Sequence, residues 1–494
     1  MKIPEFVLEI IEKLQSGGQS AYLVGGCVRD LLMAKEPKDW DIATDARPEI
    51  MLKLLPGSKY ENAFGTVLVP IRNESNDVVE VTTYRSEQGY SDRRHPDEVL
   101  FEDKLEKDLE RRDFTINAMA LTKVGQAEGI SEKYITPVKI GQDDYEVVDL
   151  FGGADDLKKK IIRAVGEPSE RFKEDALRML RAIRFSCQLN FEIEPKTERA
   201  ILKLAGSVKF VSGERIRDEL VKILSSDFPS EGIMRLYNNK LLQYILPELE
   251  AGVNVKQHYH HIYTVFKHNI LSLKYCPNKS WPVRLAALLH DVGKPKSAKT
   301  VDGHIAFYNH EYIGAKMTEK IMKRLKFSNE DLTRVVNLVR NHMFYYNVGE
   351  VSAASVRRLI VKTGKENLSD LIDLRIADRL GSGLKNEMPY KLRHLQYMME
   401  KVQNDPLSVK MLQLNGSELM SVLKVGPGPK IGAILEVLLS EVLEDPELNT
   451  KEYLSKRSIE LDKLDLEELR VKAQEVIAEK LQEEDQEMKR DFKV

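Results

Sequence analysis

Two aspartates, Asp39 and Asp41, lie one residue apart in the stretch KDWDIAT. On an extended strand, residues i and i+2 point to the same side, so the two carboxylates would stand beside each other and repel. A cation between them would remove this repulsion. Carboxylates at a strand end suit Mg²⁺ when the ion must also hold substrate phosphates. These two residues therefore predict a magnesium-dependent site for a phosphorylated substrate.

The preceding segment, YLVGGCVRDLL, predicts a strand that ends at Gly25 and Gly26 and is followed by the start of a helix. Adjacent glycines let the backbone come close to a ligand, and the amides at a helix N-terminus suit a phosphate. Arg29 would add a positive charge at the same place. A tight turn without any ligand is the alternative interpretation of the two glycines.

A second group of residues with chemical potential lies in the other half of the chain. Eight of the ten histidines fall between His258 and His342. Within this region, LAALLHDVGKPKS places His290 next to Asp291 at the end of an apolar helical run. A neutral ring nitrogen and a carboxylate together suit zinc, manganese, iron or a similar ion. The pattern therefore predicts a second metal site of a different kind.

The elements that position these residues belong to a chain of 494 residues, which is too long for one core and predicts about three or four domains. The N-terminal MKIPEFVLEIIEKL predicts an amphipathic helix. Strand patterns such as AYLVGG, TVLVPI and VVEVTTY mix with helical ones in the first part. Helical periodicity dominates from about residue 166 onward.

The composition is typical of a globular protein, with 42% hydrophobic and 31% charged residues. A net charge of −3 gives no overall attraction to nucleic acid, so such a partner would need local basic patches. Cys27, Cys187 and Cys276 follow no paired spacing, which predicts a reducing compartment. No apolar run approaches the roughly 18 residues of a membrane span. We therefore expect a cytoplasmic protein with no membrane partner.

The first half of the chain resembles the class II nucleotidyltransferases, which comprise the tRNA CCA-adding enzymes and bacterial poly(A) polymerases. The resemblance rests on the ordered motifs GGCVRD, DWDIAT, ERRDFTINAMA, DLFGG, EDALRMLRAIRF and SGERIRDEL. It implies a polymerase-beta-like head in which Asp39 and Asp41 hold the catalytic Mg²⁺. It also implies that Gly26 and Arg29 contact the nucleotide and that Arg112 contacts its triphosphate region.

The motif EDALRMLRAIRF places Asp175, Arg178, Arg181 and Arg184 at every third position of a predicted helix. A salt-bridged helix face is one interpretation. The resemblance implies another, in which Asp175 and Arg178 read the base. Cytosine and adenine present an amino donor beside a ring-nitrogen acceptor, which suits an accepting carboxylate and a donating guanidinium and opposes guanine and uracil. Arg181 and Arg184 are then expected to contact phosphate or primer.

The histidine-rich region resembles the HD phosphohydrolase family, whose ligands follow the order His, His-Asp, further histidines and Asp. The resemblance implies a core metal set of His268, His290, Asp291 and Asp378. A second ion would add His310 and His342. The metal would be a divalent transition ion, Mn, Ni, Fe, Co or Zn, which lowers the pKa of a coordinated water. Lys294 is expected at the phosphate, and His258, His260 and His261 are expected to be loop or substrate contacts.

Two further segments bear on the choice among related functions. SEQGYSDRRHPDEVLFEDKLEKDLE resembles the flexible loop that CCA-adding and A-adding enzymes use in the switch to ATP, and enzymes that add only CC lack it. CC-only addition is therefore not expected, whereas A-only addition and poly(A) synthesis stay open. In LNGSELMSVLKVGPGPKIGAILEVLL we expect a turn between helices. A contact of Lys430 and its glycines with the tRNA backbone is the alternative.

We therefore expect an α+β protein built from four regions. They are a mixed-sheet head over residues 1–165, a helical neck and body over 166–250, an all-α HD domain over 251–385 and a helical C-terminal region over 386–494. The expected function is addition of CCA to the 3′ end of tRNA from CTP and ATP, with the HD domain acting as a phosphatase or phosphodiesterase in 3′-end repair. The rivals are a nucleotide-signalling HD hydrolase with a degenerate head and a noncatalytic RNA-binding protein.

Overall fold

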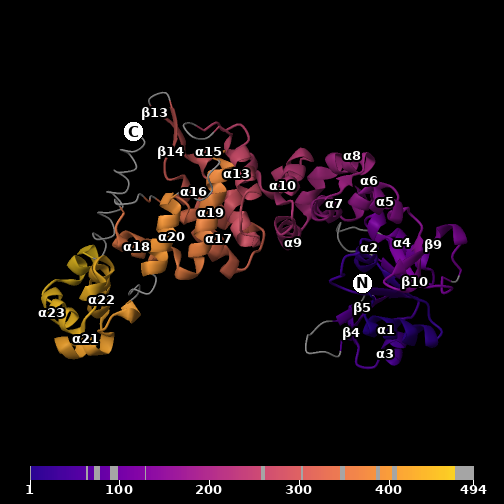
Figure 1. The fold of residues 1–494 in the computed structure, drawn as a ribbon, viewed down its shortest axis with the longest axis horizontal. Coiled ribbons are helices and arrows are strands. Elements are labelled where there is room, and N and C mark those ends of the chain that lie inside the picture. The colour runs from indigo at the N-terminus through magenta and orange to yellow at the C-terminus, as the bar shows by residue number, and fades with distance from the viewer. Residues whose placement is uncertain are drawn as a thin grey trace. The chain divides into compact units, whose positions relative to one another are not determined.

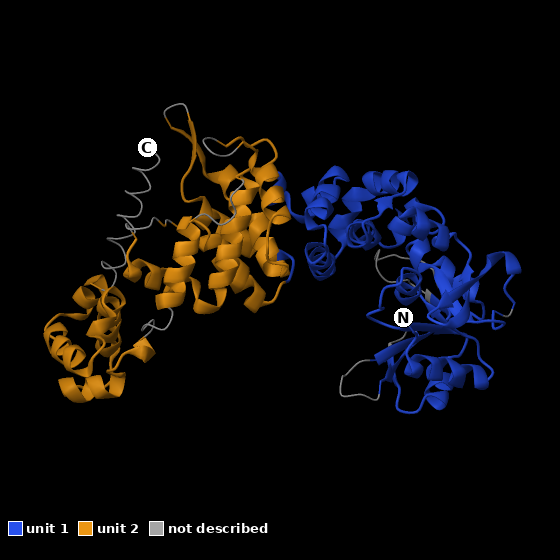
Figure 2. Ribbon diagram, in the orientation of Figure 1, with its two compact units in different colours: residues 1–250, 324–326 blue, residues 251–323, 327–494 orange. Residues whose placement is uncertain are grey.

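The chain forms two compact units (Figure 2). The computed structural model describes residues 2–62, 65–71, 78–88, 98–127, 129–257, 262–301, 304–344, 346, 351–384, 390–402 and 409–472. The first unit contains residues 1–250 and 324–326, and the second contains residues 251–323 and 327–494. Each unit has apolar cores of its own.

An eight-stranded mixed sheet forms the head of the first unit (Figure 1). The strand order is β3 (Lys59–Asn62), β4 (Thr66–Pro70), β5 (Val78–Thr83), β2 (Asp41–Thr44), β1 (Ala21–Val24), β8 (Met119–Lys123), β10 (Asp143–Asp149) and β9 (Ile135–Ile140). Neighbouring strands are antiparallel except for β2 and β5, which are parallel. The three segments with strand patterns become β1, β4 and β5, as predicted.

Alternation along the strands gives the sheet two apolar faces. On β1, Leu23 belongs to the larger cluster, whereas Tyr22 and Val24 belong to the other. The larger cluster is completed by side chains from α1 (Glu5–Ser16), α2 (Gly26–Leu32) and α3 (Pro48–Leu54), and the smaller one by α4 (Leu105–Glu110). The predicted amphipathic N-terminal helix is confirmed as α1, because its apolar residues are buried.

Helices make up most of the rest of the first unit. They are α5 (Gly153–Lys159), α6 (Pro168–Glu174), α7 (Leu177–Leu189), α8 (Pro195–Leu204), α9 (Gly213–Leu224), α10 (Pro229–Asn238), α11 (Leu242–Ile245) and α12 (Pro247–Glu250). The short strands β11 (Ile161–Ile162) and β12 (Glu192–Ile193) pair in parallel between them. Helix α7 packs against α9 and α10, so the motif EDALRMLRAIRF leads into a helix in the interior of this bundle.

The second unit is helical, with one short hairpin. Its helices are α13 (Val265–Lys274), α14 (Trp281–Leu289), α15 (Lys294–Ser297), α16 (His310–Arg324), α17 (Asn329–Asn341), α18 (Ala353–Thr363), α19 (Leu368–Gly381), α20 (Tyr390–Val402), α21 (Gly416–Leu423), α22 (Pro429–Glu444) and α23 (Lys451–Leu461). The hairpin consists of β13 (Ala298–Val301) and β14 (His304–Phe307). The predicted α+β class, with a mixed-sheet head followed by helical regions, is confirmed.

Some predicted features fall outside the described residues. The segment that resembles the flexible loop pairs at its base as β6 (Arg85–Gln88) and β7 (Glu98–Phe101), but residues 89–97 are not described. The same holds for His258, His260 and His261. Within the described part of the chain, no helix is long and apolar enough to cross a membrane.

Candidate functional site

Three carboxylates lie together at one end of the parallel pair of strands. Asp41 opens β2, Asp39 precedes it by two residues, and Glu80 on β5 is directly opposite Asp41 in the strand register. Burial, together with the charge of Asp39, raises the pKa of Asp41 despite the opposing effect of Arg112. Burial and the neighbouring Asp41, Glu61 and Asp39 raise the pKa of Glu80. Glu80 was not predicted from the sequence, although the acid that interrupts the strand VVEVTT was a signal.

The turn at Gly25 brings a guanidinium against these carboxylates. Gly25 has φ 79°, and a Cβ there would lie 2.7 Å from Nη1 of Arg112 and 3.5 Å from Oδ2 of Asp41. Only glycine fits both this backbone conformation and this space. The Arg112 guanidinium is anchored by the buried Asp108 at 3.0 Å and by the backbone carbonyl of Asn117 at 3.5 Å. The turn at Gly25 thus brings together Asp41 and Arg112, which were both predicted to belong to the site.

Arg29 and Gly26 lie at the start of α2, directly after this turn. The Arg29 guanidinium pairs with Asp30 at 2.8 Å and donates to Oδ1 of Asn117 at 2.9 Å. Asn117 therefore contacts both Arg29 and Arg112, since its side chain accepts from one and its backbone from the other. The two predicted phosphate-binding arginines are fixed by one residue of the motif RRDFTINAM.

Of the predicted base-reading pair, Arg178 lies in the first turn of α7, whereas Asp175 was expected on the same helix but is the extended residue that ends α6. Asp175 and Arg178 are each held by other partners. Asp175 accepts the backbone N–H of Leu177 at 3.0 Å and forms a two-point pair with Arg215 at 3.2 and 2.6 Å. Arg178 is buried and donates to Glu174 at 2.5 Å and to the backbone carbonyl of Arg111 at 3.1 Å. Arg215 and Glu174 fix the orientation of the pair. Neither was singled out by sequence analysis.

Arg181 and Arg184, which were expected at phosphate or primer, both have acidic partners in the bundle. Arg181 pairs with Asp113 at 2.6 Å and Arg184 with Glu219 at 3.1 Å. Burial lowers the pKa of Arg184 to about 10. Their guanidinium carbons also lie 5.5 and 4.1 Å from the centre of the Phe185 ring. In this arrangement both arginines join α7 to other segments of the first unit, through Asp113 and Glu219.

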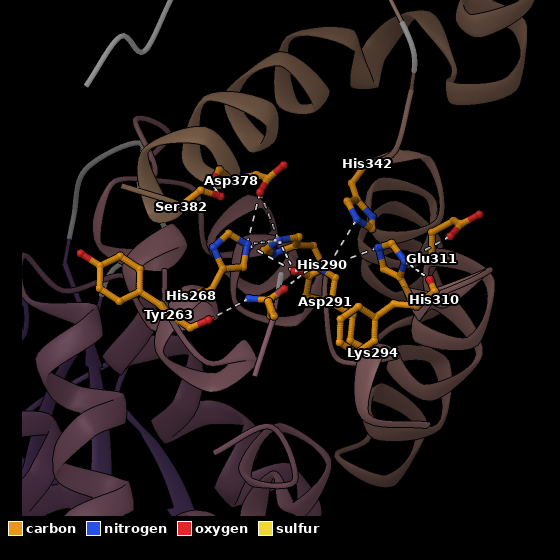
Figure 3. A network of polar contacts seen from close by, with 12 residues as sticks. Tyr263, His268, His290, Asp291, Lys294, His310, Glu311, His342, Asp378 and Ser382 are labelled. Atoms are coloured by element: carbon orange, nitrogen blue, oxygen red, sulfur yellow. Dashed lines mark hydrogen bonds and ion pairs between the residues drawn. The ribbon is translucent and has the colours of Figure 1, made fainter. Parts of the chain in front are cut away.

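In the second unit, six predicted ligands gather into two triads. His268, His290 and Asp378 form one, and Asp291, His310 and His342 form the other, with potential ligand atoms within 4.8 Å of each other in each triad. Figure 3 shows Asp291 between the two groups of imidazoles. Its Oδ2 lies 3.3 Å from Nε2 of His268, and its Oδ1 lies 3.3 Å from Nε2 of His310. One carboxylate thus faces both triads.

The ends of three helices and the interiors of two others supply five of these ligands. His290 and His342 cap the C-termini of α14 and α17, His310 begins α16, and His268 and Asp378 lie within α13 and α19. Gly293 permits the close approach of α16, because a Cβ there would lie 2.1 Å from the His310 carbonyl oxygen. The glycine of the HDVG sequence is therefore required for the position of α16.

Hydrogen bonds to the backbone fix the tautomers of three histidines. Nδ1 of His290, His310 and His342 lies 2.9, 2.8 and 2.7 Å from the carbonyl oxygens of Ala287, Phe307 and Val339, respectively. Because a carbonyl only accepts, Nδ1 carries a proton in each ring, and Nε2 presents its lone pair to the cluster whenever the ring is neutral. Such rings are suited to bind a metal ion.

The buried Nε2 atoms of His310 and His342 make no hydrogen bond to any described residue. Each faces a carboxylate oxygen of Asp291, at 3.3 and 3.7 Å, so lone pairs oppose one another. Burial lowers the pKa of His342 to about 4, which keeps this ring neutral. Burial also disfavours a proton on His290, but Asp291 and Asp378 outweigh it and raise the pKa to about 10. The donor set fits a divalent cation.

Two lysines for which contacts were predicted, Lys294 and Lys430, form ion pairs and hydrogen bonds within the second unit. Nζ of Lys294 lies 2.6 Å from Oδ2 of Asp291 and donates to Oε1 of Gln257 at 2.6 Å. It is thus directed toward the six residues of the two triads, which we call the metal-ligand cluster, and a phosphate contact was predicted there. Nζ of Lys430 instead donates to the backbone carbonyl of Asp462 at 2.5 Å and lies 3.0 Å from its carboxylate. This contact joins α22 to the end of α23. It favours the expected turn between helices over a contact of Lys430 with the tRNA backbone.

Comparison with known families agrees with the two units. A family model described as the poly A polymerase head domain matches residues 21–163. A second model, described as a probable RNA and SrmB-binding site of polymerase A, matches residues 190–252. The model of the HD domain matches residues 270–382. An A-adding tRNA nucleotidyltransferase from Deinococcus radiodurans is 33% identical over 438 residues, which cover 85% of this chain and 90% of that protein. The chain belongs to the tRNA nucleotidyltransferase and poly(A) polymerase family.

Other relatives in this family are CCA-adding enzymes. That of Lactiplantibacillus plantarum is 31% identical over 88% of this chain and 90% of its own length. That of Lactobacillus helveticus is 45% identical over a shorter stretch, 45% of this chain and 51% of that enzyme. The crystal structure of the Bacillus stearothermophilus CCA-adding enzyme in complex with CTP has a TM-score of 0.68 and 25% identity, and the match covers 94% of this chain and 98% of that one.

Proposed function

We propose that this chain adds C, C and A to the 3′ end of tRNA, using CTP and ATP. The observation that carries the proposal is the set of carboxylates Asp39, Asp41 and Glu80 beside Arg112, in the same unit as Asp175 and Arg178. The CCA-adding relatives and the structure with bound CTP support this choice of nucleotides. The three buried, unpaired cysteines are consistent with a cytoplasmic location, which we also propose.

In the head, Asp39 and Asp41 would hold Mg²⁺, with Glu80 as the neighbouring acid. The ion would supply charge stabilisation for an attacking 3′-oxygen and for the departing pyrophosphate. The glycine turn, with Arg29 and Arg112, would bind the triphosphate and orient its α-phosphorus toward the tRNA end. The 3′-hydroxyl would lose its proton to solvent as its oxygen bonds to this phosphorus and the bond to pyrophosphate breaks.

At the other end of the nucleotide, Asp175 and Arg178 would read the base. Arg178 donates to an acceptor, and Asp175 accepts from an amino group. A carboxylate has about four lone-pair sites, so Asp175 can accept from a base while it keeps its two bonds to Arg215. Glu174 holds the guanidinium of Arg178 in place. One pocket can thus accept both cytosine and adenine.

The replacement Asp41→Asn tests the head. It keeps the size of the side chain but removes a charged ligand, so we expect incorporation of labelled CMP into tRNA lacking CCA to fall by at least about 100-fold, on the order of 2.7 kcal/mol of transition-state stabilisation. Phosphohydrolysis by the second unit should not change. Asp143→Asn, at an exposed position of β10, is the control. CMP incorporation at the wild-type rate by the Asp41→Asn variant would refute the assignment.

In the second unit, we propose a metal-dependent phosphohydrolase that removes a phosphate or cyclic phosphate from an RNA 3′ end. Two triads, one containing Asp291 and the other faced by its carboxylate, support a two-ion site of Mn, Ni, Fe, Co or Zn. Such an ion would lower the pKa of a bound water, which makes it an effective nucleophile. Lys294 holds a positive charge 2.6 Å from Asp291, where it would attract a phosphate oxygen.

The replacement Asp291→Asn tests the second site. We expect less bound transition metal per chain by inductively coupled plasma mass spectrometry, and loss of phosphohydrolysis, because one carboxylate serves both triads. CMP addition by the head should stay at the wild-type level. Glu330→Gln, at an exposed position of α17, is the control. Wild-type metal content in the Asp291→Asn variant would contradict the proposed ligand set.

A further inference from the structure

One face of α20 carries aromatic side chains that do not belong to an apolar core. Tyr390, His394 and Tyr397 are at helical positions i, i+4 and i+7, which lie on one face. Tyr390 is 61% exposed and Tyr397 is 57% exposed. The opposite face packs inward through the buried residues Leu392, Leu395, Met399 and Val402. Helix α20 is therefore anchored mainly by its other face, and Tyr390 and Tyr397 are left largely exposed.

A fourth ring completes this surface. The Tyr346 hydroxyl hydrogen-bonds to Nδ1 of His394, and the centres of these two rings are 5.9 Å apart. The ring centres of Tyr390 and Tyr397 lie 5.9 and 6.1 Å from that of His394. Three phenol rings thus surround one imidazole. We call Tyr346, Tyr390, His394 and Tyr397 the α20 aromatic surface.

Helix α20 itself carries a net positive charge. Helix α20 contains three cations and one acid, giving +3 − 1 = +2, whereas the whole chain has a net charge of −3. Arg393 and Lys401 follow Tyr390 and Tyr397 by three and four residues, so they lie on or beside the aromatic face. Exposed aromatic rings with adjacent cations favour a partner that has flat rings and negative charges.

The surface is connected to the metal-ligand cluster by short segments. Nη1 of Arg375 lies 2.8 Å from Oδ2 of Asp378, and its guanidinium carbon lies 5.7 Å from the centre of the Phe344 ring. Phe344 is midway between His342 and Tyr346 in the sequence. Four residues of chain span at most about 14 Å, so Tyr346 is close to the ligand His342. One short strand of nucleic acid can therefore reach both places.

We propose that the α20 aromatic surface binds the unpaired bases of an RNA strand whose terminal phosphate enters the metal-ligand cluster. Bases stack on aromatic side chains with little regard for sequence, and cations track the phosphate backbone. The proposal rests on the phosphohydrolase function proposed above, and it names the substrate class of that site as single-stranded RNA ends.

The test compares the double variant Tyr390→Ala/Tyr397→Ala with Tyr275→Ala, which removes an exposed tyrosine elsewhere in the same unit. The substrates are a short unpaired oligoribonucleotide with a 3′-phosphate and p-nitrophenyl phosphate, which has no base or strand to bind. We expect the double variant to raise KM for the oligoribonucleotide roughly tenfold through lost stacking. Its kcat/KM for p-nitrophenyl phosphate, and both parameters of the control, should stay at wild-type values.

Three outcomes would overturn the proposal. They are an unchanged KM for the oligoribonucleotide, an equal loss on both substrates, and a change in oligomeric state of the double variant at unchanged RNA affinity, which would assign the surface to a second copy of the chain. If the wild type hydrolyses neither substrate, the phosphohydrolase proposal fails by itself. Photocrosslinking with 5-iodouridine RNA then decides: attachment at Tyr390 or Tyr397 supports the surface, and attachment confined to the first unit overturns it.

Discussion

At the scale of single residues, Asp113 shows how the acids of the first unit act on structure as well as chemistry. Its Oδ1 accepts from the backbone of Phe114 and from Asn117, and its Oδ2 accepts from Arg181. Burial alone would raise the pKa of Asp113, but Arg181 at 2.6 Å outweighs it and lowers the pKa. The charged form is therefore the one that stabilises the fold.

The replacement Asp113→Asn should lower the free energy of unfolding at pH 7 by about 2 kcal/mol, less than a fully buried pair because the Arg181 side chain is 33% exposed. The lowered pKa lies below the unfolded value of about 3.9, so this stability is present above that pH and is lost as the pH falls through the folded-state pKa. Denaturant unfolding at pH 7 and pH 3 measures it, with the exposed Asp155→Asn as control. A difference of equal size at both pH values would contradict this.

Residue chemistry and family resemblance each predicted part of the groups that the fold brings together. Asp39 and Asp41 were found from their spacing and the pair His290-Asp291 from its residue types, whereas His268, Asp378, His310 and His342 followed from the resemblance to the HD family. Glu80, Glu174 and Arg215 were not found, because their roles depend on partners. Glu80 is opposite Asp41 only through strand pairing, and Arg215 reaches Asp175 from a helix 40 residues away. Periodicity does not determine such partners.

At the scale of elements, α7 links the two ends of the proposed nucleotide site. The centre of the Phe185 ring lies 4.1 Å from the guanidinium carbon of Arg184, 5.3 Å from that of Arg29 and 5.5 Å from that of Arg181. Arg29 follows the glycine turn, whereas α7 begins next to Asp175. This ring therefore couples the proposed phosphate-binding end to the proposed base-reading end.

The replacement Phe185→Leu keeps most of the apolar volume but removes the aromatic face that attracts cations. We expect less than about 1.5 kcal/mol loss of stability, together with a fall of roughly tenfold in kcat/KM for CMP addition, which Phe185→Tyr should restore. Phe172→Leu, at another buried position of the first unit, is the control. Equal effects of Phe185→Leu and Phe172→Leu on kcat/KM would show that Phe185 acts only through packing.

The existence of the principal elements followed from periodicity, but their arrangement did not. The apolar run AYLV and the segment VVEVTT predicted strands, and both are strands. Nothing in these segments indicated that β2 would pair with β5 in parallel and with β1 in antiparallel fashion. Burial of Arg178 and Arg184 was also not foreseeable, because a stripe of charges at helical spacing usually indicates an exposed face. Their partners on other segments explain the difference.

At the scale of the whole molecule, the chain combines two candidate sites that need no shared residue. The carboxylates and arginines of the proposed transferase lie in the first unit, and both triads of the proposed phosphohydrolase lie in the second. The order of a nucleotide-adding head and a domain with proposed phosphohydrolase activity suits an RNA end that must carry a free hydroxyl before it can be extended. The central claim is that the first unit selects both CTP and ATP.

The most direct measurement supplies tRNA ending before CCA, after C and after CC, with CTP and ATP given separately and together. We predict two added CMP residues on tRNA ending before CCA and one on tRNA ending after C. We predict one added AMP on tRNA ending after CC, and no extension beyond the terminal A. Both additions should occur in one pocket, so Arg178→Ala should reduce both. Addition of AMP without any CMP would identify A-only activity, and a long run of A would identify poly(A) synthesis; either result would contradict CCA addition.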